Sequence, residues 1–320
     1  MKYGKQFGLT TAALAVAGFM SIGAAQAASS PGGFFAPGDN LVSDNDAEEL
    51  IDNNGNGTLD VGDYLQGIIK WGTIENAANP GGASLTAGTV NELTGVFRVE
   101  VTSKTFQSVG LDGLGGTADD IFSYTFGADT SGAFQAAYGV AAGAVATFFE
   151  DTDGASQDYS RQGPPGDLLT GTGDYGLASD GTLVWVWGFA GDEDEQWLAT
   201  GVQTPDASSV PGATTLAEFN FQLSSLFFAY GTLGQTAAGC VPAPYVFGVN
   251  ENPCLSAAGD SLIDINGGGS VVAPAASSDW PVWTNTDITV NVVPEPGTFG
   301  MLGLGLVGLG WIVRKRQKNA

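Results

Sequence analysis

The chain has 320 residues, and its 34 Asp and Glu residues outnumber its 10 Lys and Arg residues, for a formal net charge of −24. A surface this acidic repels nucleic acids and anionic membranes, because it cannot supply the cations that phosphate contacts require. The chain has no histidine, which excludes Ser-His-Asp and Cys-His catalytic groups and the usual zinc sites. A hydrophobic content of 43% argues against wholesale disorder.

The first 27 residues have the order of a secretory signal peptide. Lys2 and Lys5 precede an apolar run over residues 7–25, which is followed by small residues up to Ala27. We therefore expect cleavage after Ala27 and export of the mature chain. An N-terminal membrane anchor is the alternative interpretation.

The mature chain has a larger excess of negative charge than the whole sequence. Without residues 1–27 and 293–320, 33 carboxylates remain, and the remaining cations are Lys70, Arg98, Lys104 and Arg161. Such a charge attracts divalent cations and destabilises the compact state unless counter-ions screen it. Calcium outside the cell is an available source of that screening.

Residues 52–63 have the spacing of a twelve-residue calcium loop. Oxygen-bearing side chains fall at positions 1, 3, 5, 9 and 12, Gly57 falls at turn position 6, and position 7 offers its main-chain carbonyl. The candidate ligands are Asp52, Asn54, Asn56, Thr58, Asp60 and Asp63. Calcium takes six or more oxygens, and alternate residues of a tight loop point inward. The loop resembles the EF-hand type and is closest to dockerin-like loops, which also accept Asp at position 12.

The flanks of this loop predict a short helix-loop-helix over residues 39–72. Residues 47–51 favour helix, and Tyr64, Leu65, Ile68 and Ile69 share one helical face. Because the chain shows no partner EF-hand, we expect a structural ion of modest affinity, about 10⁻⁴ to 10⁻³ M, rather than a switch. The alternative is an N-cap at Asp60 with Asp63 as its capping-box partner, after an Asn-Gly turn.

A second acidic, Gly-rich stretch covers residues 112–120. It resembles Asp-Gly-rich turns of bacterial surface proteins that sometimes hold calcium, and a bare β-turn explains it equally well. The acidic residues at 151–154 and 192–195 are expected to be solvated loops.

Short apolar segments separated by Gly-rich turns predict a mainly β, sandwich-like fold. Strands are expected at residues 93–101, 121–126, 183–189 and 218–223, of which 121–126 and 219–223 alternate with period two. Residues 134–149 are Ala-rich and fit a helix or a pair of strands. Trp185 and Trp187 share one strand face and could stack on a sugar, but their apolar neighbours favour a buried core position.

Cys240 and Cys254 are the only cysteines. In an exported protein we expect them to form a disulfide, which would add roughly 3 kcal/mol of stability in the chain-entropy model. The intervening segment contains Pro242, Pro244 and Pro253 and is expected to be a surface excursion. Two free thiols or a metal site are the alternatives.

Residues 293–320 have the composition of an export-sorting signal. Pro294, Glu295 and Pro296 precede an uncharged span over residues 297–313, and a basic tip follows. As a helix the span would reach about 25 Å, near the minimum for crossing a bilayer, with its C-terminus held in the cytoplasm. A buried or amphipathic helix is the alternative. The succession of a Pro-Glu-Pro triplet, an uncharged span and a basic tip resembles the PEP-CTERM sorting signal. This resemblance implies recognition by exosortase, cleavage near residues 294–297 and loss of the membrane helix.

The resemblance implies a protein that is anchored transiently in the inner membrane of a Gram-negative bacterium and then reaches the cell surface or the extracellular matrix. For residues 28–292 it implies a structural or adhesive role in biofilm, floc or exopolysaccharide, with calcium stabilising the protein or bridging it to acidic polymer. No phosphate-binding loop or dinucleotide fingerprint occurs, and we expect no enzyme. A carbohydrate-binding module and a polysaccharide-active enzyme with paired carboxylates are the alternatives.

Overall fold

The computed structural model describes the central part of the chain. The described residues are 35, 38–76, 79–84, 92–151, 159, 163–191, 195–203, 215–229, 232–234, 236–237, 240–242, 254–256, 262–263, 265–272 and 279–293. The predicted signal cleavage at Ala27, the residues Pro294, Glu295 and Pro296, and the predicted membrane helix at 297–313 lie outside them. Within the described part, none of the helices is long and apolar enough to cross a membrane.

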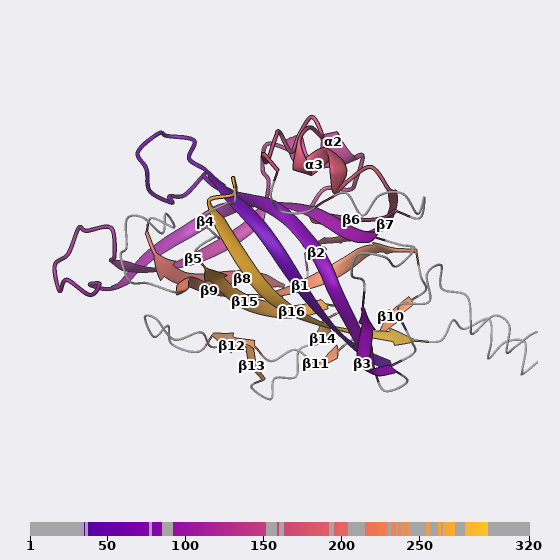
Figure 1. The fold of residues 1–320 in the computed structure, drawn as a ribbon. Helices are drawn as coiled ribbons and strands as arrows, with labels where there is room; N and C mark the ends of the chain where they lie inside the picture. The colour runs from indigo at the N-terminus through magenta and orange to yellow at the C-terminus, as the bar shows by residue number, and fades with distance from the viewer. Residues whose placement is uncertain are drawn as a thin grey trace, which may run out of the picture.

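Most described residues belong to one large antiparallel sheet (Figure 1). Its strands are β1 (Gly38–Ile51), β2 (Tyr64–Asn76), β3 (Asn79–Ser84), β4 (Glu92–Ser108), β5 (Ile121–Ala128), β6 (Ala144–Asp151), β7 (Thr182–Gly188), β8 (Gln196–Val202), β9 (Thr215–Phe228), β10 (Thr232–Gly234), β15 (Ile265–Val272) and β16 (Val282–Val293). Two small ladders pair β11 (Thr236–Ala237) with β14 (Leu262–Ile263), and β12 (Cys240–Pro242) with β13 (Cys254–Ser256). The short helices are α2 (Ala133–Tyr138) and α3 (Asp174–Leu177).

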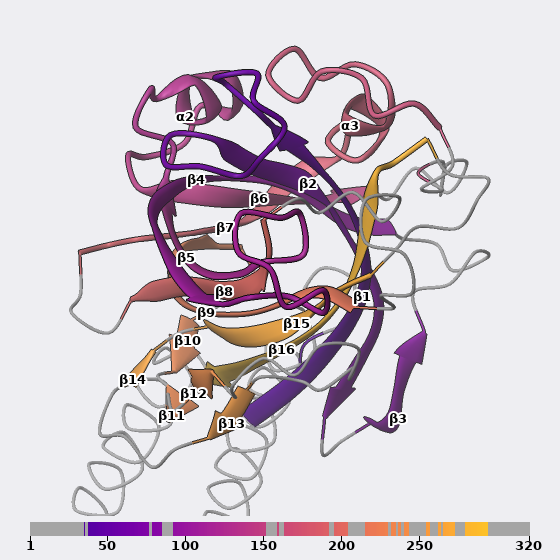
Figure 2. The same ribbon diagram turned by 90° about the vertical axis from the view of Figure 1, so that its left-hand side faces the viewer.

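The large sheet closes on itself, as Figure 2 shows in a view along its axis. β4 pairs with β2 on one side and, along its length on the other side, first with β6 and then with β5. β9 likewise pairs with β15 on one side and with β8 and then β7 on the other. The pairs β6–β7 and β5–β8 complete the circuit. The prediction of a mainly β fold is confirmed, but the sandwich-like arrangement is replaced by a single closed sheet.

The four predicted strands are confirmed as β4, β5, β7 and β9. The Ala-rich stretch contains both structures, because α2 is followed by β6. The predicted helix-loop-helix is wrong. The segment before the loop is β1 and the segment after it is β2. Residues 40–51 pair with β2, and residues 38–43 and 46–48 also pair with β16. Pairing on both sides outweighs the helix-favouring residues 47–51, because propensity is only a weak prior.

The interior of the closed sheet is filled by aromatic rings. Trp71, Phe148, Trp185 and Trp187 are buried together, and the ring centroids of Phe148 and Trp187 are 4.2 Å apart. Both predicted tryptophans therefore occupy the core, as their apolar neighbours indicated. Inward-facing glycines make room for the rings. A Cβ added at Gly267 would lie 2.5 Å from Cζ of Phe221.

A second apolar cluster covers part of the outside. Both views place α2 and α3 outside the closed sheet, near β2, β4 and β6 (Figures 1 and 2). Tyr175 and Trp280 meet there edge to face with centroids 5.3 Å apart, and the Trp280 Nε1–H donates to Asp174 Oδ2. These contacts attach α3 to the segment just before β16, and the Tyr175 hydroxyl donates to Glu49 Oε1 of β1 at 2.9 Å.

Candidate functional site

The predicted calcium loop connects β1 to β2 at one end of the closed sheet. Gly55, Gly57 and Gly62 adopt positive φ angles of 72°, 77° and 93°, which favour glycine. The turn that the spacing predicts at Gly57 is therefore present. Strands rather than helices flank the loop, so it is not part of an EF-hand helix pair.

Asp52, at position 1, accepts hydrogen bonds from the main chain of the first half of the loop. Its Oδ2 accepts a hydrogen bond from the Gly57 N–H at 2.6 Å, and its Oδ1 accepts from the Gly55 and Asn54 N–H groups at 2.7 and 3.1 Å. These main-chain donors, the Gly57 N–H first, hold the pKa of Asp52 below its ordinary value. Asp52 therefore carries its charge at neutral pH.

Asp60 and Asp63 accept hydrogen bonds from other groups of the loop. Asp60 Oδ2 accepts from Asn56 Nδ2 at 2.7 Å and from Thr58 Oγ1 at 2.8 Å, while its Oδ1 lies 2.8 Å from the Lys104 ammonium. These contacts lower the pKa of Asp60, the Asn56 amide and Lys104 contributing most. The buried Asp63 accepts the Asn53 and Asp60 N–H groups at 2.9 and 2.7 Å.

The loop offers the donor chemistry that calcium prefers, since its ligands would all be oxygens. All six candidate ligands that the sequence indicated lie in this loop. The side chain at position 3 also orders the turn, because Asn54 Oδ1 accepts the Asn56 N–H at 3.1 Å. Two features oppose a high affinity. Lys104 neutralises one carboxylate, and in the described part of the chain no three acidic or Cys side chains are grouped to hold a metal ion.

The second acidic stretch forms the loop between β4 and β5 and lies at the same end of the sheet, as Figure 1 shows. Asp119 Oδ2 accepts the Asp112 N–H at 3.1 Å, and Asp120 Oδ2 accepts the Gly116 N–H at 2.6 Å. The main-chain donor at Asp112 is the largest cause that lowers the pKa of Asp119. The β-turn interpretation of this stretch therefore accounts for the hydrogen bonds that its carboxylates make.

Gln203 connects the two acidic loops. Its carbonyl accepts the Leu59 N–H at 3.1 Å, and its N–H donates to the Asp120 carbonyl at 3.2 Å. Lys104 adds a side-chain connection from β4 to Asp60. The two loops are therefore parts of one surface at this end of the molecule.

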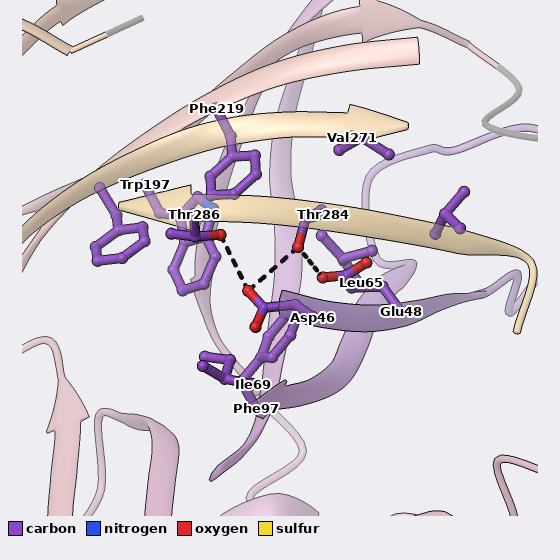
Figure 3. Close-up of a pocket in the computed structure, with 12 residues that line it drawn as sticks. Asp46, Glu48, Leu65, Ile69, Phe97, Trp197, Phe219, Val271, Thr284 and Thr286 are labelled. Carbon is purple, nitrogen blue, oxygen red and sulfur yellow. Dashed lines mark hydrogen bonds between the residues drawn. The ribbon is translucent and has the colours of Figure 1, made fainter. Parts of the chain in front are cut away.

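A second candidate site, which the sequence analysis missed, lies inside the closed sheet. Asp44, Asp46 and Glu48 occupy alternate positions of β1 and face inward, and their exposed fractions are only 1%, 3% and 2%. Thr284 and Thr286 of β16 face Asp46 and Glu48 (Figure 3), and the Thr286 N–H donates to Asp44 Oδ1 at 2.8 Å. Asp46 Oδ2 accepts from the hydroxyls of Thr284 and Thr286 at 3.2 and 3.0 Å.

The Thr284 hydroxyl joins two of these carboxyl groups. The Thr284 hydroxyl contacts both Asp46 Oδ2 and Glu48 Oε1, but a hydroxyl has one hydrogen and can donate to only one of them. The second contact therefore needs a protonated carboxyl group as its donor. Burial raises the pKa of Asp46 to about 7, and burial together with the charge of Asp46 raises that of Asp44. Both shifts favour the protonated forms of Asp44 and Asp46.

No described cation faces this acid cluster. Lys70 pairs with Glu92 at 3.7 Å, Arg98 with Asp129 at 3.2 Å and Lys104 with Asp60, all elsewhere. A cavity of about 30 Å³ adjoins the cluster and is lined otherwise by apolar side chains such as Phe97, Trp197 and Phe221. This volume is enough for about two water molecules, which could hydrogen-bond Asp46 Oδ1, an atom with no partner among the described residues.

Comparison with known proteins places the chain in its cellular context. Residues 292–316 match the PEP-CTERM protein-sorting motif. The described fold is that of a mainly β protein, and the C-terminal motif makes the chain an exported protein that exosortase sorts to the cell surface. Neither a curated protein nor a solved structure matches the chain.

The predicted cysteine pair is only partly described. β12 and β13 pair so that Cys240 lies opposite Ser256 and Cys254 lies opposite Pro242. The two cysteine positions are therefore diagonal neighbours on the same face of a two-strand ladder, where Cα atoms lie about 7–8 Å apart. The disulfide remains a prediction.

Proposed function

We propose that the chain is a structural or adhesive component of the cell surface or extracellular matrix and that calcium stabilises it through the loop at residues 52–63. The observation that carries the cellular role is the sorting motif at residues 292–316. The closed sheet supports this role, because a rigid core held by ladders on all sides resists unfolding outside the cell.

The calcium part of the proposal rests on the loop. Asp52, Asp60 and Asp63 are ordered in a turn of the required length, with Gly57 at a positive φ angle. A bound ion would draw on the oxygens of the six candidate ligands and would compete with Lys104 for Asp60. We expect affinity in the extracellular range, about 10⁻⁴ to 10⁻³ M. A bridge to acidic exopolysaccharide would use the remaining coordination positions of that ion.

The two alternative functions have less support. Of the described tryptophans, Trp71, Trp185, Trp187, Trp197 and Trp280 are buried and Trp283 is half-buried, so no row of exposed tryptophans for stacking on sugars occurs in this part of the chain. The interior carboxyl groups have raised pKa values, as an acid catalyst would need. Their cavity of about 30 Å³ is about tenfold smaller than ordinary ligand pockets, which disfavours a polysaccharide-active enzyme.

The proposal is tested by thermal unfolding of the exported protein in EDTA and in a calcium titration up to about 10 mM, a range that covers extracellular affinities. Calcium should raise the melting temperature, and Asp52→Ala should abolish the rise. Asp112→Ala in the other loop is the matched control and should keep the rise. Absence of a rise in the wild type would remove calcium from the proposal.

The adhesive role needs a separate experiment, because a protein can bind calcium without promoting adhesion. Cells that lack the chain should aggregate less and retain less exopolysaccharide than the parent strain. Re-expression of the wild type should restore both properties, and Asp52→Ala should restore them only in part at low calcium. Unchanged aggregation in the deletion strain would contradict the adhesive role.

A further inference from the structure

Exposed apolar side chains gather at the end of the molecule that carries the two acidic loops. Among the described residues, eight large apolar side chains are exposed: Leu41, Val61, Phe106, Val109, Leu111, Leu114, Leu177 and Phe227. Five of them lie at this end. Val61 belongs to the loop at residues 52–63, Phe106 to the end of β4, and the other three to the β4–β5 loop. Here we call Val109, Leu111 and Leu114 the apolar tip.

In the β4–β5 loop, carboxylates accept hydrogen bonds from the main chain of the loop, and three apolar side chains are exposed to solvent. Asp112 Oδ1 accepts the Leu114 N–H at 2.7 Å, and Asp119 Oδ2 accepts the Asp112 N–H. The carboxylates thus accept hydrogen bonds from main-chain N–H groups of the loop. The side chains of Leu111 and Leu114 are 67% and 62% exposed. Single exposed apolar residues are common, but several together on a monomer mark an interaction surface.

The apolar tip is held in a defined position. The β4–β5 hairpin continues outward beyond the closed sheet, where the Phe106 ring meets Phe122 edge to face at 5.6 Å. Lys104 lies over the Phe122 ring at 4.5 Å and also holds Asp60. A surface held in this way loses little conformational freedom on binding, which favours recognition of a partner.

The negative charges around the apolar tip favour a positively charged partner. The two loops contribute the carboxylates of Asp52, Asp60, Asp112 and Asp119 to this surface, whereas Asp63 and Asp120 are buried. The Lys104 ammonium is already paired with Asp60. An anionic membrane would be repelled by this surface, and so would a second copy of the chain, which would bring the same carboxylates.

We propose that the apolar tip and the surrounding carboxylates form a docking surface for a basic, apolar segment of a partner protein. Apolar side chains of the segment cover Val109, Leu111 and Leu114, and its Lys or Arg side chains approach Asp112 and Asp119. This goes beyond the proposed function, because it needs neither bound calcium nor a polysaccharide.

The test uses the exported protein and a fluorescein-labelled synthetic peptide of alternating Leu and Lys, with binding followed by fluorescence anisotropy. The double variant Leu111→Ser/Leu114→Ser should bind at least about tenfold more weakly than the wild type. The matched control is Leu177→Ser/Phe227→Ser, which removes two exposed apolar side chains elsewhere and should bind like the wild type. Because all four side chains are exposed, both variants should keep the wild-type melting temperature.

Further measurements distinguish the proposed docking from attraction by charge alone, from membrane binding and from dimerisation. A Ser-Lys peptide of the same charge should bind far more weakly than the Leu-Lys peptide, and raising the salt from about 0.05 to 0.5 M should weaken binding of the latter. Equal binding of both peptides would mean attraction by charge alone and would overturn the proposal. So would binding to phosphatidylglycerol vesicles in preference to the peptide, or a dimer in sedimentation that the tip variant abolishes.

Discussion

The Lys104 ammonium lies 2.8 Å from Asp60 Oδ1 and joins β4 to a loop that precedes it by 44 positions in the chain. The same ammonium lies 4.5 Å from the centre of the Phe122 ring on β5. One cation therefore connects the candidate calcium loop to the hairpin that carries the apolar tip. It also takes one of the carboxylates that an ion in the loop would need.

Lys104→Met should raise the calcium affinity of the loop at residues 52–63 severalfold. The substitution keeps the apolar stem and removes the positive charge beside Asp60, so an incoming cation meets less repulsion. Without calcium the variant should lose about 0.5–1 kcal/mol of stability, as expected for a partly exposed ion pair. Isothermal titration calorimetry with calcium measures the affinity. Lys70→Met, which removes a cation paired with Glu92 outside the loop, should leave it unchanged, and equal affinities in all three proteins would place calcium elsewhere.

The interior acid cluster should make the protein less stable as the pH rises from about 4 to 7. The ordinary pKa of an Asp is 3.8, and burial raises that of Asp46 to about 7. Between these values the unfolded chain binds fewer protons than the folded one, so the free energy of unfolding falls with rising pH. A shift of this size corresponds to about 4 kcal/mol. Urea unfolding at a series of pH values measures the slope.

Asp46→Asn tests the source of this pH dependence. The amide keeps the shape of the side chain and cannot ionise, so the slope between pH 4 and 7 should become shallower than in the wild type. Asp112→Asn, in an exposed loop, is the control and should keep the wild-type slope. If Asp46→Asn and the wild type lose stability in parallel, the pH dependence comes from the acidic surface instead.

The sequence predicted four strands with strong β patterns, but it also left β16 unpredicted although residues 282–293 are rich in Val, Thr and Ile. β4, β5, β7 and β9 contain β-branched and aromatic runs, which are enriched in strands. β1 contains Ala47, Glu48 and Glu49, and only its pairing with β2 and β16 makes it a strand. Closure of the sheet depends on contacts between distant segments, which no local pattern encodes.

The same reasoning explains which site residues could be found. The spacing of residues 52–63 indicated all six candidate ligands, because a turn with an obligatory glycine is encoded locally. The contact between Lys104 and Asp60 depends on tertiary structure and could not be predicted. The period-two pattern of Asp44, Asp46 and Glu48 was visible, but acids on alternate positions of a strand ordinarily face solvent. Only the closed sheet turns that face inward.

The predicted disulfide between Cys240 and Cys254 can be checked by alkylating the exported protein under denaturing conditions with and without reduction. Export of a chain with two cysteines favours a disulfide, which predicts labelling only after reduction. The diagonal pairing of the two strands opposes it, because about 7–8 Å between Cα atoms exceeds the usual disulfide range. The double variant Cys240→Ser/Cys254→Ser should lose roughly 3 kcal/mol of stability in the chain-entropy model. Labelling of both thiols without reduction would show that the diagonal register keeps them apart.

The last prediction concerns the glycines that face the aromatic core. A Cβ added at Gly95 would clash with the Phe148 ring, so Gly95→Ala should lose about 1–3 kcal/mol, the usual cost of overpacking. Gly115→Ala is the matched control, because its nearest neighbour would be Val109 Cγ1 at 3.8 Å, an ordinary contact. Combining Gly95→Ala with Phe148→Leu should cost less than the sum of the two single substitutions, because the smaller side chain makes room for the new methyl group. Urea unfolding of the four variants measures this coupling. Additive losses would mean that the backbone at Gly95, rather than the ring above it, requires glycine.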